Sequence, residues 1–165
     1  TLNVYGNRVF VMRNLDLQTY LPKGWTEEVN DQQQTIRMAE VLTSENKVYD
    51  HPACVDSIPS SANQEDHVSM GTTSARTAAM VLDNAQKVLG IELAAAAQGI
   101  WLRQELGENG IDNLAPATKA AYDYIRTVSA PIEDDVIMHD ELVKFDEMIK
   151  DGSFLEAVEK VVDFK

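Results

Sequence analysis

A helical pattern of unusual length dominates the middle of this 165-residue sequence. It begins with Ser61 and Gln64, which have the spacing of a capping box, and continues to about Leu106. A helix of about 40 residues spans roughly 60 Å, whereas globular helices average about 11–12 residues. Apolar residues recur along it at helical spacing: Ala75, Ala78, Leu82, Ala85, Leu89, Leu93, Ala96 and Ile100. One chain of this size offers too few neighbours to cover such a helix, so the pattern predicts a bundle shared between subunits.

Small residues within this helix predict close helix packing. Gly90 and Gly99 flank a run of four alanines at 94–97. Each interior glycine costs about 1 kcal/mol relative to alanine, so their presence here indicates that another helix approaches the backbone.

Helical patterns with clear stop signals occupy most of the remaining chain. We expect a single all-α region over residues 1–165: an irregular opening segment at 1–29, a helical core at 30–106 with a loop at 50–62, and shorter helices at 107–165. The shorter helices in or around this core are expected from Asn30 or Asp31 to Tyr49, from Pro116 to Val128, from His139 to Lys150, and after a second capping box of Ser153 and Glu156.

Composition narrows the range of partners. The net charge of −13 repels phosphate backbones and anionic lipid surfaces, so neither nucleic acid nor membrane is expected as a partner. No apolar run reaches the ~20 residues that cross a bilayer, and no secretory signal opens the chain. Cys54 is the single cysteine, so no internal disulfide can form. These features predict a soluble, acidic, cytoplasmic protein.

The segment from Asn63 to His67 carries the most chemistry, and the residues alone leave two interpretations open. Its carboxylates can simply face the positive end of a helix dipole. Alternatively, a proline-bounded loop holds Glu65 in a cleft, where it passes a proton or binds a cationic group. A metal site is not expected, because Glu65 and His67 do not share a helix face. No Gly-x-Ser-x-Gly elbow or glycine-rich phosphate loop occurs.

Several longer stretches carry a resemblance to a known family. These stretches are Ser44 to Val48, His51 to Ala53, Val55 to Pro59, Ser61 to Gly71, Asn84, Val88 with Leu89, Ile91 to Leu93, Ala96 to Gly99, Thr118 to Tyr122, and Ile125 with Arg126. In sequence and order they resemble the histidine and aromatic amino acid ammonia-lyases. The resemblance is strongest from about Ser44 to Arg103, and a match of this length is more specific than any short motif.

The resemblance implies both an activity and an assembly. The family eliminates ammonia from L-histidine, giving urocanate, or from phenylalanine or tyrosine, using a methylidene-imidazolone prosthetic group formed from an internal Ala-Ser-Gly. It implies a homotetramer of long helices acting on a small-molecule amino acid. The family's key glutamate matches Glu65, with Asn63 and Gln64 holding its orientation. An acid at this position favours histidine, because the sister branches tend to carry an amide there.

This sequence contains no Ala-Ser-Gly, so the prosthetic group cannot form within it. We therefore expect the chain to be the C-terminal portion of a longer lyase of the histidine branch. Two alternatives stay open: a phenylalanine or tyrosine ammonia-lyase or aminomutase, and a non-catalytic helical oligomerisation module.

Overall fold

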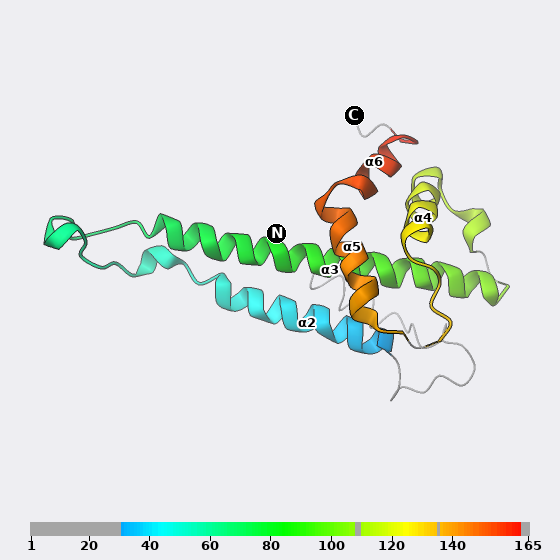
Figure 1. Ribbon diagram of the computed structural model, residues 1–165, viewed down its shortest axis with the longest axis horizontal. Helices are drawn as coiled ribbons and strands as arrows, with labels where there is room; N and C mark the ends of the chain where they lie inside the picture. The colour runs from blue at the N-terminus through cyan, green and yellow to red at the C-terminus, as the bar shows by residue number, and fades with distance from the viewer. Residues whose placement is uncertain (1–30, 108–109, 135, 163–165) are drawn as a thin grey trace.

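The computed structural model describes residues 31–107, 110–134 and 136–162 (Figure 1). Within these ranges every named element is an α-helix or a short 3-10 helix, which confirms the predicted all-α fold. The elements in chain order are α2 Asp31–Tyr49, η2 Ala53–Val55, η3 Ser61–Asn63, α3 Gly71–Glu105, η4 Ile111–Asn113, α4 Pro116–Val128, α5 Met138–Lys150 and α6 Ser153–Glu159. The irregular segment expected at 1–29 lies outside the described residues. Among the helices of the described residues, none combines the length and the hydrophobicity that a bilayer span requires.

Helix α3 is the axis of the structure. It has 35 residues and is therefore about 50 Å long. In Figure 1, α2 runs antiparallel along the first part of α3, and α5 crosses it further on. Ala39 of α2 packs against Val88 and Ile91 of α3, and the partly buried Leu42 and Leu142 cover this cluster.

The second half of α3 contributes to a larger core. Its buried members are Ala97, Tyr122, Ile125, Phe145 and Met148, which come from α3, α4 and α5. Gly90 explains how α5 comes so close to α3: a Cβ built on Gly90 would lie 3.3 Å from the Phe145 Cβ. The close helix approach predicted at Gly90 is confirmed.

Hydrogen bonds hold Arg126 of α4 and the segment that joins α4 to α5 against α3. The buried Gln98 donates through Nε2 to the carbonyl of Ile132 at 2.7 Å, and its Oε1 accepts from the Ile132 N–H at 3.1 Å. Arg126 donates to the carbonyl of Ala97 at 2.8 Å. The side-chain amide of Gln98 thus satisfies both backbone polar groups of Ile132, as the backbone of a neighbouring strand would.

The predicted start of the long helix is wrong. Helix α3 begins at Gly71, ten residues after Ser61 of the predicted capping box, and no side-chain cap forms there. Ser61 has a φ of 52°, outside the right-handed helical region, and Met70 directly before α3 has a φ of 54°. The ten residues instead belong to a loop whose hydrogen bonds run across it.

The second predicted capping box is also wrong, although its helix is confirmed. The residue at the N-cap of α6 is Gly152, with a φ of 80°, and it makes no side-chain cap. Asp151 Oδ1 accepts the N–H of Ser153 at 2.8 Å. The turn is therefore closed by the aspartate that precedes the glycine, rather than by Ser153 and Glu156.

The buried face of α3 differs from the predicted apolar stripe. The buried residues of α3 include Val81, Asn84, Val88 and Ile91, whereas Leu82 of the predicted stripe is 56% exposed. The polar Asn84 is buried because Asn46 and Glu45 of α2 accept its hydrogen bonds. Part of the apolar face of α3 is therefore left uncovered by the described residues.

Replacing Gly90 with valine is expected to destabilise the chain by about 1–3 kcal/mol, because the added atoms meet Phe145. Urea unfolding followed by circular dichroism measures the change. Ala96→Val is the matched control, since Ala96 is exposed on the same helix and gains the same branched side chain. Equal losses in both variants would contradict close packing at Gly90.

Acid should weaken the link between α3 and α5 that Asp83 makes. Hydrogen bonds from Lys150 and Lys87 lower the pKa of Asp83 from its ordinary value of 3.8. Since the folded pKa is below the unfolded one, this stabilisation is present above pH 3.8 and is lost as pH falls through the folded pKa. The side chains of Lys150 and Asp83 are 40% and 42% exposed, so the pair is worth no more than about 1 kcal/mol and is screened by salt.

We therefore expect Asp83→Asn to be slightly less stable than the parent chain at neutral pH and equally stable in acid well below pH 3.8. Unfolding midpoints measured across this range, at low and high salt, test the expectation. A difference between the two proteins that does not change with pH would contradict it.

Candidate functional site

The predicted site residues lie in a loop beyond the paired ends of α2 and α3, at the far left of Figure 1. We call residues 57–68 the tongue. Ser60 and Glu65 pair through their backbones in antiparallel fashion, with N···O distances of 2.9 and 3.3 Å. Ser57 Oγ accepts the N–H of Val68 at 2.9 Å. The two contacts are three residues apart on each arm of the tongue, so together they hold its two arms side by side.

The tip of the tongue has a left-handed backbone. Ser61, Ala62 and Asn63 have φ values of 52°, 54° and 65°. Residues with a Cβ disfavour this region by roughly 1–2 kcal/mol each. Three such residues in a row persist because the pairs at Ser60–Glu65 and Ser57–Val68 fix both strands below them.

Glu65 lies where the chain returns from the tip of the tongue, in the isolated antiparallel bridge with Ser60. Its Oε2 accepts a hydrogen bond from Ser60 Oγ at 2.9 Å, and the residue is exposed within the described chain. Its Oε1 has no hydrogen-bond partner in the described ranges. The carboxylate is therefore anchored through one oxygen and open through the other.

Asn63 and Gln64 precede Glu65 in the chain, but their side chains do not hold its carboxylate. Both are exposed, and among the described residues neither side chain hydrogen-bonds to the Glu65 carboxylate. The catalytic role of Glu65 and the supporting roles of Asn63 and Gln64 stay predictions. The side chain that contacts Glu65 belongs to Ser60, which the sequence analysis did not single out. A hydroxyl five residues before a glutamate gives no signal in a loop.

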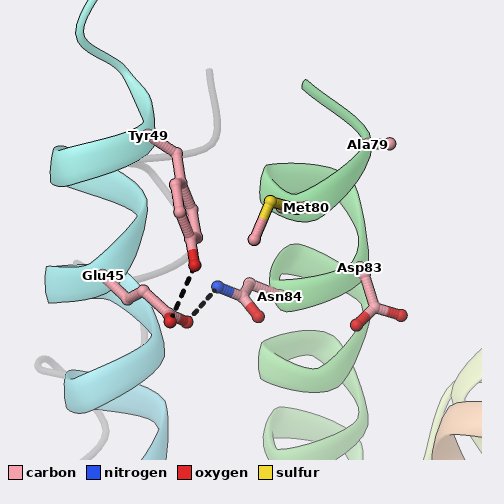
Figure 2. A pocket seen from close by; sticks show the side chains of 6 residues that line it. All are labelled: Glu45, Tyr49, Ala79, Met80, Asp83 and Asn84. Carbon is pink, nitrogen blue, oxygen red and sulfur yellow. Dashed lines mark hydrogen bonds between the residues drawn. The ribbon is translucent and has the colours of Figure 1, made fainter. Parts of the chain in front are cut away.

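A separate pocket of about 390 Å³ lies between α2 and α3 (Figure 2). Six residues line it: Glu45, Tyr49, Ala79, Met80, Asp83 and Asn84. None of them belongs to the tongue. Figure 2 shows the Tyr49 hydroxyl and the Asn84 amide both pointing at Glu45, with hydrogen bonds of 3.0 Å to Oε1 and 2.8 Å to Oε2.

These contacts make the pocket a structural junction. Both oxygens of Glu45 accept hydrogen bonds, and Asn84 also donates to Asn46 at 3.0 Å. The hydrogen bond that Tyr49 donates to Glu45 is the main factor that raises the pKa of Tyr49 above its ordinary value of 10.0. Burial and the negative charge of Glu45 raise this pKa further. The phenol thus stays a hydrogen-bond donor at neutral pH. A proton-transfer role for Glu45 is disfavoured, since both its oxygens are already occupied.

The described residues hold no group of three or more His, Cys, Asp or Glu side chains placed to bind a metal ion. The acidic groups are spread along the helices, and several are paired with lysines. Within these ranges Glu65 is a carboxylate that combines a hydrogen-bonded loop position with an open oxygen, and it lies next to the left-handed tip of the tongue.

This chain is similar in sequence to histidine ammonia-lyases. A histidine ammonia-lyase from Symbiobacterium thermophilum is 50% identical over 123 residues, which are 74% of this chain and 23% of that protein. A histidine ammonia-lyase from Clostridium tetani is 52% identical over 129 residues, which are 77% of this chain and 24% of that protein. The chain thus spans about a quarter of the length of these curated relatives.

Solved structures share the whole arrangement of helices. The histidine ammonia-lyase of Trypanosoma cruzi superposes with a TM-score of 0.82 at 32% identity, over 99% of this chain and 31% of that one. The tyrosine aminomutase of Streptomyces globisporus superposes with a TM-score of 0.83 at 30% identity, over 98% of this chain and 30% of that one. The sequence profile described as aromatic amino acid lyase matches residues 9–127, a span that includes the tongue and all of α3. With this match over most of its length and with these neighbours, the chain belongs to the aromatic amino acid lyase family and has its helical fold.

Proposed function

We propose that this chain is the C-terminal portion of an ammonia-lyase that converts L-histidine to urocanate and ammonia. The observation that carries the proposal is the tongue, which holds the Glu65 carboxylate in one place and leaves Oε1 open. Sequence identity of about 50% to two histidine ammonia-lyases supports histidine as the substrate.

In this proposal Glu65 handles the polar end of the substrate. Both the amino group and the imidazole of histidine carry N–H groups, and a carboxylate oxygen accepts from either. Bound to the amino group, Glu65 manages the proton of the departing ammonia; bound to the imidazole, it orients the ring. Ser60 keeps Oε2 occupied, so Oε1 is the atom that meets the substrate.

The prosthetic group comes from outside these residues. The family's methylidene-imidazolone supplies an electrophile that makes the amino group easier to eliminate. No Ala-Ser-Gly occurs in the 165 residues, so they cannot form it. What this chain contributes is a fixed carboxylate.

Assembly completes the site. We propose a homotetramer in which further copies cover the apolar faces that the described residues leave open, including Met38, Val41 and Val48 of α2 and Leu82 of α3. These side chains are 53%, 67%, 71% and 56% exposed, which is unusual for a run of large apolar groups on paired helices. The partners are thus other copies and a small amino acid. We place the protein in the cytoplasm, which suits its exposed, unpaired Cys54.

A second candidate follows from the structural neighbour that is a tyrosine aminomutase. In that case the substrate is tyrosine or another aromatic amino acid and the amino group is moved rather than released. Product analysis with histidine, phenylalanine and tyrosine separates the two candidates. A complete protein that turns over none of the three would support the oligomerisation module instead.

The 165-residue chain alone is expected to form no urocanate from histidine, because it lacks the sequence that makes the electrophile. Ultraviolet absorbance of the unsaturated product measures this. The positive control is the complete enzyme that joins this chain to a portion carrying Ala-Ser-Gly. Turnover by the chain alone would refute the proposed division of labour.

In the complete enzyme, Glu65→Gln is expected to lower kcat/KM for histidine by about 10²–10⁴-fold, the range for loss of a proton-transferring group. Asp66→Asn is the matched control: it removes the same charge one residue away, from another exposed side chain of the tongue. Undiminished activity of Glu65→Gln, or an equal loss in both variants, would remove Glu65 from the mechanism.

A further inference from the structure

The tongue contains one contact that its backbone does not require. The antiparallel pair between Ser60 and Glu65 is made by N–H and carbonyl groups, which any residue but proline supplies at position 60. Ser60 itself is extended, with φ −129° and ψ 178°, a conformation open to all residues. Its hydroxyl therefore does something separate from folding the loop: it donates to Glu65 Oε2 at 2.9 Å.

That contact acts on a side chain which is otherwise mobile. A glutamate has three rotatable torsions, and fixing a long polar side chain costs rotamer entropy. Glu65 is exposed in the described chain, so packing does not restrain it. The Ser60 hydroxyl supplies the restraint in its place, and it binds one oxygen only.

We propose that Ser60 is a positioning residue for Glu65: its hydroxyl holds Oε2 so that Oε1 points at the substrate. This inference rests on the proposed function, in which Glu65 meets the substrate. Ser57, by contrast, uses its hydroxyl to accept the N–H of Val68 and so shapes the backbone of the tongue. Ser57 thus holds the backbone of the tongue, and Ser60, three residues later, holds the carboxylate of Glu65.

Ser60→Ala in the complete enzyme tests this. We expect kcat/KM for histidine to fall about tenfold, the effect of losing one hydrogen bond to a charged group, while the thermal unfolding midpoint stays unchanged. Ser60→Thr keeps a hydroxyl and is expected to retain most of the activity. Ser69→Ala is the control, since Ser69 is an exposed serine just after the tongue whose hydroxyl contacts no carboxylate in the described ranges.

The double variant Ser60→Ala with Glu65→Gln gives the deciding measurement. If Ser60 acts through Glu65, the double variant is no slower than Glu65→Gln alone. An additional tenfold loss in the double variant would overturn the proposal.

The outcomes also separate this inference from the function on which it rests. A large loss in Glu65→Gln with full activity in Ser60→Ala would overturn the positioning role and leave the proposed function standing. Full activity in Glu65→Gln would overturn both.

Discussion

The structure depends on the length of α3. Both apolar clusters are built on it: the middle of α3 packs against α2 through Val88 and Ile91, and its second half packs against α4 and α5 through Ala97. A helix of this length cannot bend around its own core, so its neighbours are arranged along it in series. The contacts of these neighbours with α3 depend on single residues, such as Gly90, which has no side chain, and Gln98, which hydrogen-bonds through its amide.

Much of the helical layout could be predicted from the sequence, because residues at the helix ends themselves carry the start and stop signals. Pro116 starts α4, as expected from its fixed φ. Gly152, just before α6, adopts the positive φ that glycine tolerates. The start of α3 was mispredicted for the opposite reason. Ser61, Ala62 and Asn63 adopt a left-handed conformation that their residue types disfavour, and pairing across the loop imposes it. No pattern of neighbouring residues signals such a turn.

The buried face of α3 shows a second limit. Apolar spacing alone selects Leu82, which is exposed, and passes over Asn84, which is buried. Asn84 is buried because Glu45 and Asn46 lie opposite it, 39 and 38 residues earlier in the chain. A polar side chain can occupy an interface only when a distant partner meets it, and distance in sequence hides that partner. The resemblance singled out Glu65 for the site; the Ser60 contact needed the folded loop.

The strained tip of the tongue has a consequence for association. Its three left-handed residues are held by pairs within the same chain, so their conformation is set before any other surface arrives. A flexible segment that becomes ordered on binding loses conformational entropy, and this loss lowers its binding affinity. In the proposed assembly the tongue does not incur this entropy cost, because pairs within its own chain already hold its conformation.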